Sequence, residues 1–123
     1  MGTAAGDDTI TLTTRGKVVV ATIKGGSFHE EKQILATLER LGQIIDSRKN
    51  VKMVVDLETV EYLSSAGLGR LVALLKKAMA GGGKVHLANL QSEIQELFDV
   101  MRLTQIFSIY PDVDTAAEAF PAD

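Results

Sequence analysis

Two short segments near the start of the chain show the apolar patterns of β-strands. Ile10 and Leu12 alternate with threonines, which predicts a half-buried strand. Residues 18–23 are almost all apolar and β-branched, which predicts a strand that is covered on both faces. Gly16 and Lys17 separate the two segments and form a turn signal, so we expect a β-hairpin.

After the hairpin the apolar residues follow a helical period. From about Glu30 to Ser47 they recur every three or four positions, which predicts an amphipathic helix. The apolar stripe of this helix is Ile34, Leu38, Leu41 and Ile45. An apolar strand over 51–57 follows, and then a second helix begins after Leu63 and ends at the glycines 81–83. The apolar stripe of the second helix is Leu68, Leu71, Val72, Leu75 and Met79.

The last third of the chain continues to alternate strands with helices. Ser92 and Gln95 have the spacing of a capping box, which predicts the start of a third helix over 93–101. The remaining predicted elements are strands over 85–88 and 106–110 and a closing helix over 114–120. Strands that are joined through helices imply parallel neighbours with right-handed crossovers. The fold class is therefore α/β: a small mixed sheet of about five strands, with an opening hairpin and then βα repeats, packed with about four helices.

Composition limits the domain organisation and the chemistry. The chain has 123 residues, 46% of them hydrophobic and 24% charged, so we expect one globular domain over 9–120 behind a loose tail of residues 1–8. A net charge of −3 makes nucleic acid an unexpected partner. The absence of cysteine excludes disulfides and thiolate metal sites, and two histidines leave little for a histidine-built metal site. We expect no cofactor and no metal.

The opening residues do not resemble a targeting signal. They lack a basic start and an apolar stretch, and the longest apolar run is too short to span a bilayer. These patterns predict a cytoplasmic location without membrane insertion.

The second helix has an unusual start. A strand ends at Asp56-Leu57, and the helix opens with Ser64-Ser65-Ala66-Gly67-Leu68-Gly69. Each glycine costs about 1 kcal/mol relative to alanine inside a helix, which points to close approach by another surface. The opening turn contains no acid, so the positive end of the helix dipole is left for an outside anion. A phosphate on Ser65 would be received by the backbone N–H groups there without melting the helix.

A serine at a helix start is most often a plain N-cap, and this is the alternative for Ser64. The serine pair, the two glycines and the missing acid together favour a site of modification or contact instead.

The run from Asp56-Leu57 to Leu63-Ser64-Ser65-Ala66-Gly67-Leu68-Gly69 resembles the STAS domain family, in particular the bacterial anti-sigma factor antagonists. The resemblance extends over roughly Thr9 to Phe120 and includes the triple-glycine stop before Lys84. It implies regulation by partner switching. The unmodified protein would bind an anti-sigma factor serine kinase and free a sigma factor, phosphorylation would abolish binding, and a phosphatase would reset the protein.

The resemblance also implies roles for individual residues. Aligning the chain on Gly67-Leu68-Gly69 places the phosphoacceptor at Ser65, with Ser64 as the second choice. The implied partner-binding residues are Asp56, Ser64, Ser65, Ala66, Gly67, Leu68, Gly69 and Arg70. Two acids that are common in the family are replaced here, by Ser64 and by Phe28. Glu30, Glu58 and Glu61 are the nearby acids that would substitute for them.

Two other functions remain open with the same fold. The first is a STAS scaffold subunit of a transport or stress-signalling complex, without a phosphate cycle. The second is a nucleotide-binding module that uses the same helix start. For Arg70, Lys76 and Lys77 on the outer side of the second helix, the alternatives are a solvated face and part of the partner surface.

Catalysis is not expected. A nucleophilic serine needs a base, only His29 and His86 are available, and the Gly-x-Ser-x-Gly pattern is missing. The run Gly81-Gly82-Gly83-Lys84 precedes a strand rather than a helix, so we interpret it as a helix stop and not a phosphate loop. His29-Glu30-Glu31 lacks a second histidine at helical spacing, and His86 has the position of an ordinary strand residue.

Overall fold

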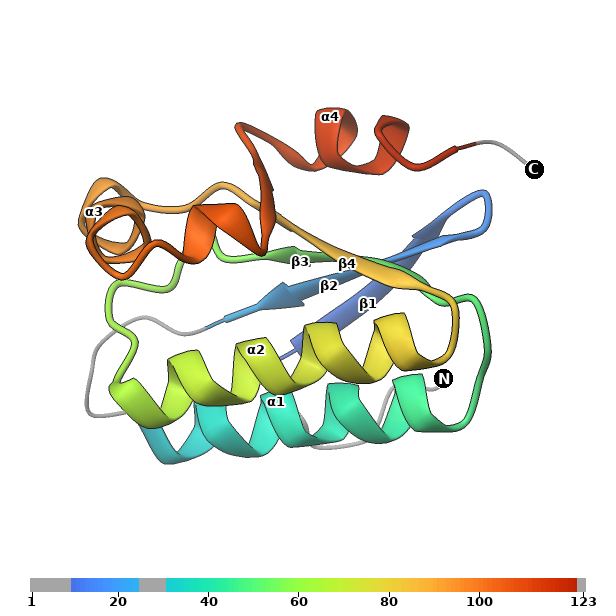
Figure 1. Cartoon of the computed structure of the whole chain (residues 1–123), viewed down its shortest axis with the longest axis horizontal. Coiled ribbons are helices and arrows are strands. Elements are labelled where there is room, and N and C mark those ends of the chain that lie inside the picture. The colour runs from blue at the N-terminus through green and yellow to red at the C-terminus, as the bar shows by residue number, and fades with distance from the viewer. Residues whose placement is uncertain (1–9, 25–30, 122–123) are drawn as a thin grey trace.

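The computed structural model describes residues 10–24 and 31–121, which form a five-stranded sheet with helices on both faces (Figure 1). The strands are β1 (Ile10–Arg15), β2 (Val18–Ile23), β3 (Lys52–Asp56), β4 (Lys84–Ala88) and β5 (Ser108–Tyr110). The helices are α1 (Glu31–Asp46), α2 (Ser65–Ala80), α3 (Ser92–Val100), the 3₁₀ turn η2 (Leu103–Gln105) and α4 (Val113–Glu118). The expectations for residues 1–8 and for Phe28, His29 and Glu30 lie outside the described residues.

The sheet has the predicted mixed character. Its strand order is β1-β2-β3-β4-β5, in which β1 and β2 form the antiparallel hairpin and the other neighbours are parallel. Gly16 at the hairpin turn has φ +61°, a conformation that glycine adopts without a steric penalty. Because β2, β3 and β4 run in the same direction, their carboxyl ends lie at one edge of the sheet. The β3–α2 and β4–α3 loops begin at this edge.

The two faces of the sheet carry unequal cores. Helices α1 and α2 cover one face, and α4 covers part of the other (Figure 1). All four residues of the stripe predicted for the first helix are buried in the larger core. The smaller core consists of Val18, Val20, Val54, Ala88, Ala116 and Phe120. This two-sided cover explains why β3 and β4 are nearly continuous apolar runs.

Two side chains predicted for the core are exposed. Met79 is 58% exposed, and Leu74 is buried on α2 instead, because the buried face of this helix is turned slightly from the predicted one. Leu12 is 47% exposed because β1 is an edge strand that buries little beyond its first residues.

The predicted capping box is wrong. Gln91 is the N-cap of α3 without a side-chain bond to the helix, and Ser92 is already the first helical residue. The Gln91 side chain instead donates to the carbonyl of Glu58 in the β3–α2 loop, at 2.7 Å. The last strand is also shorter than predicted and begins at Ser108, because Ile106 and Phe107 belong to the turn after η2 and donate their N–H groups to the Leu103 carbonyl.

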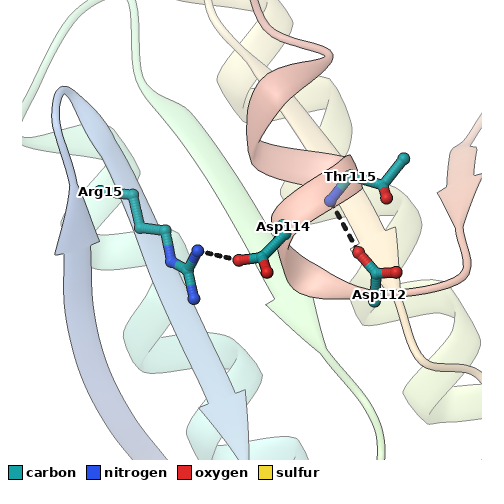
Figure 2. A network of polar contacts seen from close by, with 4 residues as sticks. All are labelled: Arg15, Asp112, Asp114 and Thr115. Carbon is teal, nitrogen blue, oxygen red and sulfur yellow. Dashed lines mark hydrogen bonds and ion pairs between the residues drawn. The ribbon is translucent and has the colours of Figure 1, made fainter.

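Helix α4 is fixed at its first turn by polar contacts (Figure 2). Asp112 caps the helix by accepting from the Thr115 N–H at 2.7 Å, and this hydrogen bond lowers the pKa of the Asp112 carboxyl. Asp114 forms an ion pair with Arg15 at the end of the β1–β2 hairpin. Both partners of that pair are largely exposed, so it contributes little stability.

His86 on β4 packs beneath α4 and is 3% exposed. Its Nδ1–H donates to the Ala116 carbonyl at 2.9 Å, and its ring stacks on Phe120 with centroids 3.8 Å apart. Burial lowers the pKa of His86 below its ordinary value of 6.5, the hydrogen bond to Ala116 opposes that shift, and the Lys84 charge adds to it. The expectation of a satisfied strand histidine is confirmed.

Over the described ranges, no helix has the length and apolar character needed to cross a membrane.

The lowered pKa of His86 predicts a loss of stability in mild acid. In the unfolded chain His86 binds a proton near pH 6.5, whereas in the folded chain it binds a proton only at a lower pH. The contribution of His86 to the free energy of unfolding is therefore complete above about pH 6.5 and decreases as the pH falls below that value. Urea unfolding between about pH 5 and 8 measures this. His86→Gln keeps a side-chain donor and removes the titration, so its stability changes less with pH. His29→Gln is the matched control and retains the slope; an equal slope in all three proteins contradicts the assignment.

Candidate functional site

The serine pair lies at the carboxyl edge of the sheet, where β3 passes into α2. Asp56 is the last residue of β3, a loop over 57–64 follows, and Ser65 opens α2. The β4–α3 loop leaves the sheet at the same edge, so the start of α2 and the whole of α3 occupy one end of the molecule (Figure 1).

Ser64 is the N-cap of α2. Its backbone is extended, and its hydroxyl oxygen accepts from the Gly67 N–H at 3.1 Å. The side chain is half-buried. A cap of this kind stabilises a protein by about 1 kcal/mol relative to alanine, so folding accounts for Ser64.

Ser65 differs from its neighbour in every respect that matters for modification. It is the first helical residue, it is exposed, and its hydroxyl has no hydrogen-bond partner in the described part of the chain. The first turn of α2 contains no acid, as the sequence indicated. The first N–H groups of a helix have no acceptor inside it, so an anion on Ser65 meets a favourable dipole and free donors.

The two glycines of the helix start have different surroundings. Gly67 is buried, and a Cβ there would lie 3.2 Å from Leu63 Cδ2, so internal packing explains it. Gly69 is exposed, and a Cβ there would meet nothing within 4 Å. Leu68 is 5% exposed and belongs to the larger core. Ser65, Ala66 and Gly69 therefore form the exposed surface at the start of α2, and Gly67 and Leu68 pack in the interior below it.

A buried carboxylate anchors the loop before the serines. Asp56 is 7% exposed, and its Oδ1 accepts from the Glu58 N–H at 3.1 Å and from Asn89 Nδ2 at 3.0 Å. Its Oδ2 accepts a longer bond from Thr22 Oγ1 at 3.4 Å. These contacts join the ends of β2, β3 and β4, so Asp56 supports the loop that leads to the serines.

Two amide side chains that sequence reasoning missed complete this anchor. Asn89 has φ +60° and directs its side chain to Asp56, while Gln91 holds the Glu58 carbonyl. Thr59 adds a bond from its hydroxyl to the Ile23 carbonyl at 3.0 Å. The only sign in the sequence was that two amide residues, Asn89 and Gln91, follow the strand β4. Their role can be inferred only when β4 is known to lie beside β3.

Two of the three cations of α2 are paired with acids of α1. Arg70 lies 3.5 Å from Glu39, and Lys77 donates to Asp46 at 2.7 Å. The paired side chains are about half exposed, so these ion pairs are weak links across the α1–α2 surface. Lys76 is exposed. The solvated-face interpretation thus fits Lys76, whereas Arg70 and Lys77 have partners on α1.

The arrangement offers an exposed hydroxyl and a place for a phosphate. His86 is committed to Ala116 and Phe120 on the α4 side of the sheet, the face opposite α2, so it is not a base for either serine. Among residues 10–24 and 31–121, no group of three histidine, acidic or cysteine side chains is placed to hold a metal ion. Glu58 and Glu61 are exposed on the loop and carry negative charge.

Comparison with known proteins identifies the family of the chain. The family model for the STAS domain matches residues 9–116. BtrV of Bordetella bronchiseptica, named as a proposed anti-sigma factor antagonist, is 30% identical over 69 residues, which are 56% of this chain and 60% of BtrV. The chain therefore spans less than two thirds of the length of that relative.

Two solved structures share the fold. An anti-sigma factor antagonist from Mycobacterium paratuberculosis matches with a TM-score of 0.74 and 24% identity, covering 95% of this chain and 97% of that one. The Bacillus cell fate determinant SpoIIAA in its phosphorylated form matches with a TM-score of 0.60 and 16% identity, covering 90% and 99%. Since the family match takes in most of the residues, from the opening hairpin to α4, the chain belongs to the STAS domain family.

Proposed function

We propose that this chain is an anti-sigma factor antagonist whose partner binding is controlled by phosphorylation of Ser65. The observation that carries the proposal is the division of roles at the start of α2. Ser64 serves the fold as the cap, and Ser65 leaves an exposed hydroxyl without a structural role. The naming of BtrV and the fold shared with a phosphorylated regulator support it.

In this proposal the unmodified surface binds an anti-sigma factor kinase and releases a sigma factor in the cytoplasm. Exposed Ser65, Ala66 and Gly69 present small side chains or none, so that a partner approaches the helix backbone closely. Asp56, Ser64 and the buried Gly67 and Leu68 hold that surface in shape, and Arg70 borders it.

Phosphorylation opposes binding through charge. A phosphate adds about −1.5 to −2 charges at neutral pH, on a surface where Glu58 and Glu61 are already exposed. Burying that group against a partner requires its desolvation or matching cations. A discrimination of about 3 kcal/mol changes affinity more than a hundredfold, which is enough for a switch without a change of fold.

The direct test uses protein purified from its own host. We expect a single added phosphate on Ser65, detected by intact mass and site mapping, that is absent from Ser65→Ala. Ser64→Ala is the matched control: it loses about 1 kcal/mol of stability with the cap but keeps the phosphate. Ser65→Ala retains the partner, and the phosphorylated protein releases it.

The opposite result identifies a different function. If the protein is never phosphorylated, and if Ser65→Ala and Ser65→Asp both still bind its partners, the protein is a constitutive scaffold and the proposal is wrong.

We expect different effects on stability when each of the two glycines is replaced by alanine. Gly69→Ala raises the free energy of unfolding by about 1 kcal/mol, because an exposed helical glycine gains propensity and its Cβ meets nothing. The same change weakens partner binding if the partner's surface touches the Gly69 backbone. Gly67→Ala gains less stability or loses some, since its Cβ crowds Leu63. Urea unfolding and partner affinity measured side by side test this, and unchanged affinity for Gly69→Ala and Gly69→Gln excludes close approach at that position.

Phosphorylation itself should leave the helix intact. A phosphate at the first position of α2 gains about 0.3–1 kcal/mol from the helix dipole at low ionic strength. We therefore expect the melting temperature of the phosphorylated protein to equal or slightly exceed that of the unmodified protein, with the difference reduced by salt. A clear fall in melting temperature would show that the switch works by unfolding the helix start instead.

A further inference from the structure

A cavity of about 590 Å³ lies at the amino edge of the sheet, on the side covered by α4. It is bordered by Lys52 of β3, Lys84 and His86 of β4, Tyr110 of β5 and Phe120 after α4. Its volume falls within the range of about 300–1,000 Å³ that small-molecule sites occupy. Ser65 follows the carboxyl end of β3, so this cavity is separate from the proposed switch.

Two lysines border the cavity. Lys52 and Lys84 are register partners on neighbouring parallel strands, so their side chains project from the same face of the sheet. Lys52 Nζ donates to the Pro121 carbonyl at 2.8 Å, which orients its side chain toward the segment after α4. Lys84 has no ion pair in the described part of the chain, and no carboxylate is among the described residues that line the cavity.

The floor of the cavity is aromatic. The rings of His86 and Phe120 stack with an interplanar angle of 9°, and the Tyr110 ring lies with its centroid 5.0 Å from that of His86. Burial is the main cause of the lowered pKa of His86, and the Lys84 charge adds a smaller effect in the same direction. The cavity therefore combines an aromatic lining with the Lys84 ammonium, which has no ion pair among the described residues.

The glycine-rich turn beside the cavity, residues 81–83, offers no free backbone N–H group to a ligand. The N–H groups of Gly81, Gly82 and Gly83 all donate to carbonyls at the end of α2, and the Lys84 N–H donates to Val51. Gly83 is needed for packing, since a Cβ there would lie 2.1 Å from the Val51 carbonyl oxygen. The helix-stop interpretation of this run is confirmed, and recognition of an anion falls to the Lys84 side chain.

We propose that this cavity binds a small organic anion that carries an aromatic group. Its carboxylate or phosphate pairs with the ammonium group of Lys84, and its ring packs on Tyr110 and Phe120. The proposal is independent of the phosphorylation of Ser65.

Titration of the whole chain with phenyl phosphate, followed by amide and histidine NMR signals, tests this. We expect saturable shifts at residues 50–52, 82–86 and 119–121, and a rise in the pKa of His86 as the anion offsets the Lys84 charge. Inorganic phosphate and phenol, each lacking half of the ligand, bind at least about tenfold more weakly. Lys84→Gln lowers the affinity for phenyl phosphate by a similar factor, while the matched control Lys76→Gln, an exposed lysine of α2 outside the cavity, leaves it unchanged.

Three results would overturn the proposal. The first is the absence of saturable shifts with phenyl phosphate at millimolar concentration. The second is an equal loss of affinity in Lys84→Gln and Lys76→Gln, which would show attraction to overall charge. The third is that Asp123→Asn moves the same signals, which would show that the lysines serve the chain's own acidic residue. None of these results bears on Ser65, whose phosphate is measured by mass.

Discussion

The geometry of the proposed switch depends on one buried carboxylate at the end of a central strand. Asp56 accepts hydrogen bonds from three segments, through the side chains of Thr22 and Asn89 and the backbone of Glu58. A buried charge is costly unless it is hydrogen-bonded, so these partners are held together by the need to satisfy it. The loop that leads to the serine pair begins at Asp56, so the contacts of Asp56 help to set the position of the start of α2.

The start of α2 separates two demands that a single serine would have to meet at once. A capping serine must keep its hydroxyl bonded to the helix, whereas a phosphoacceptor must offer its hydroxyl to a kinase. Ser64 does the first, and Ser65 is free for the second. The helix therefore keeps its cap in both states, which is why charge is sufficient for the proposed switch and refolding is unnecessary.

The unequal cover of the sheet accounts for the second proposed site. The long helices α1 and α2 cover one face, whereas the short α4 covers only part of the other. The amino ends of β3 and β4 on that side are left with polar residues and a cavity. A small domain with one strongly packed face can thus carry protein contacts at one edge of its sheet and a ligand at the other.

The sequence by itself determined most of the secondary structure, because periodicity, turn glycines and helix stops are local patterns. The hairpin at Gly16, the buried stripe of α1, the glycine stop after α2 and the serine pair at a helix start were all predicted from neighbouring residues. Where those patterns predicted wrongly, at Met79 and Ser92, a tertiary contact or the exact rotation of a helix overrode the local signal.

Only the tertiary structure decided which distant residues meet. Asp56 and Asn89 lie on different strands, and nothing in the local sequence of either specifies the other. The same holds for Lys52 and Lys84, which become neighbours through the parallel register of β3 and β4. The physical reason is that a one-residue change of register would point these side chains to the opposite face, and the register is set by the packing of the whole core.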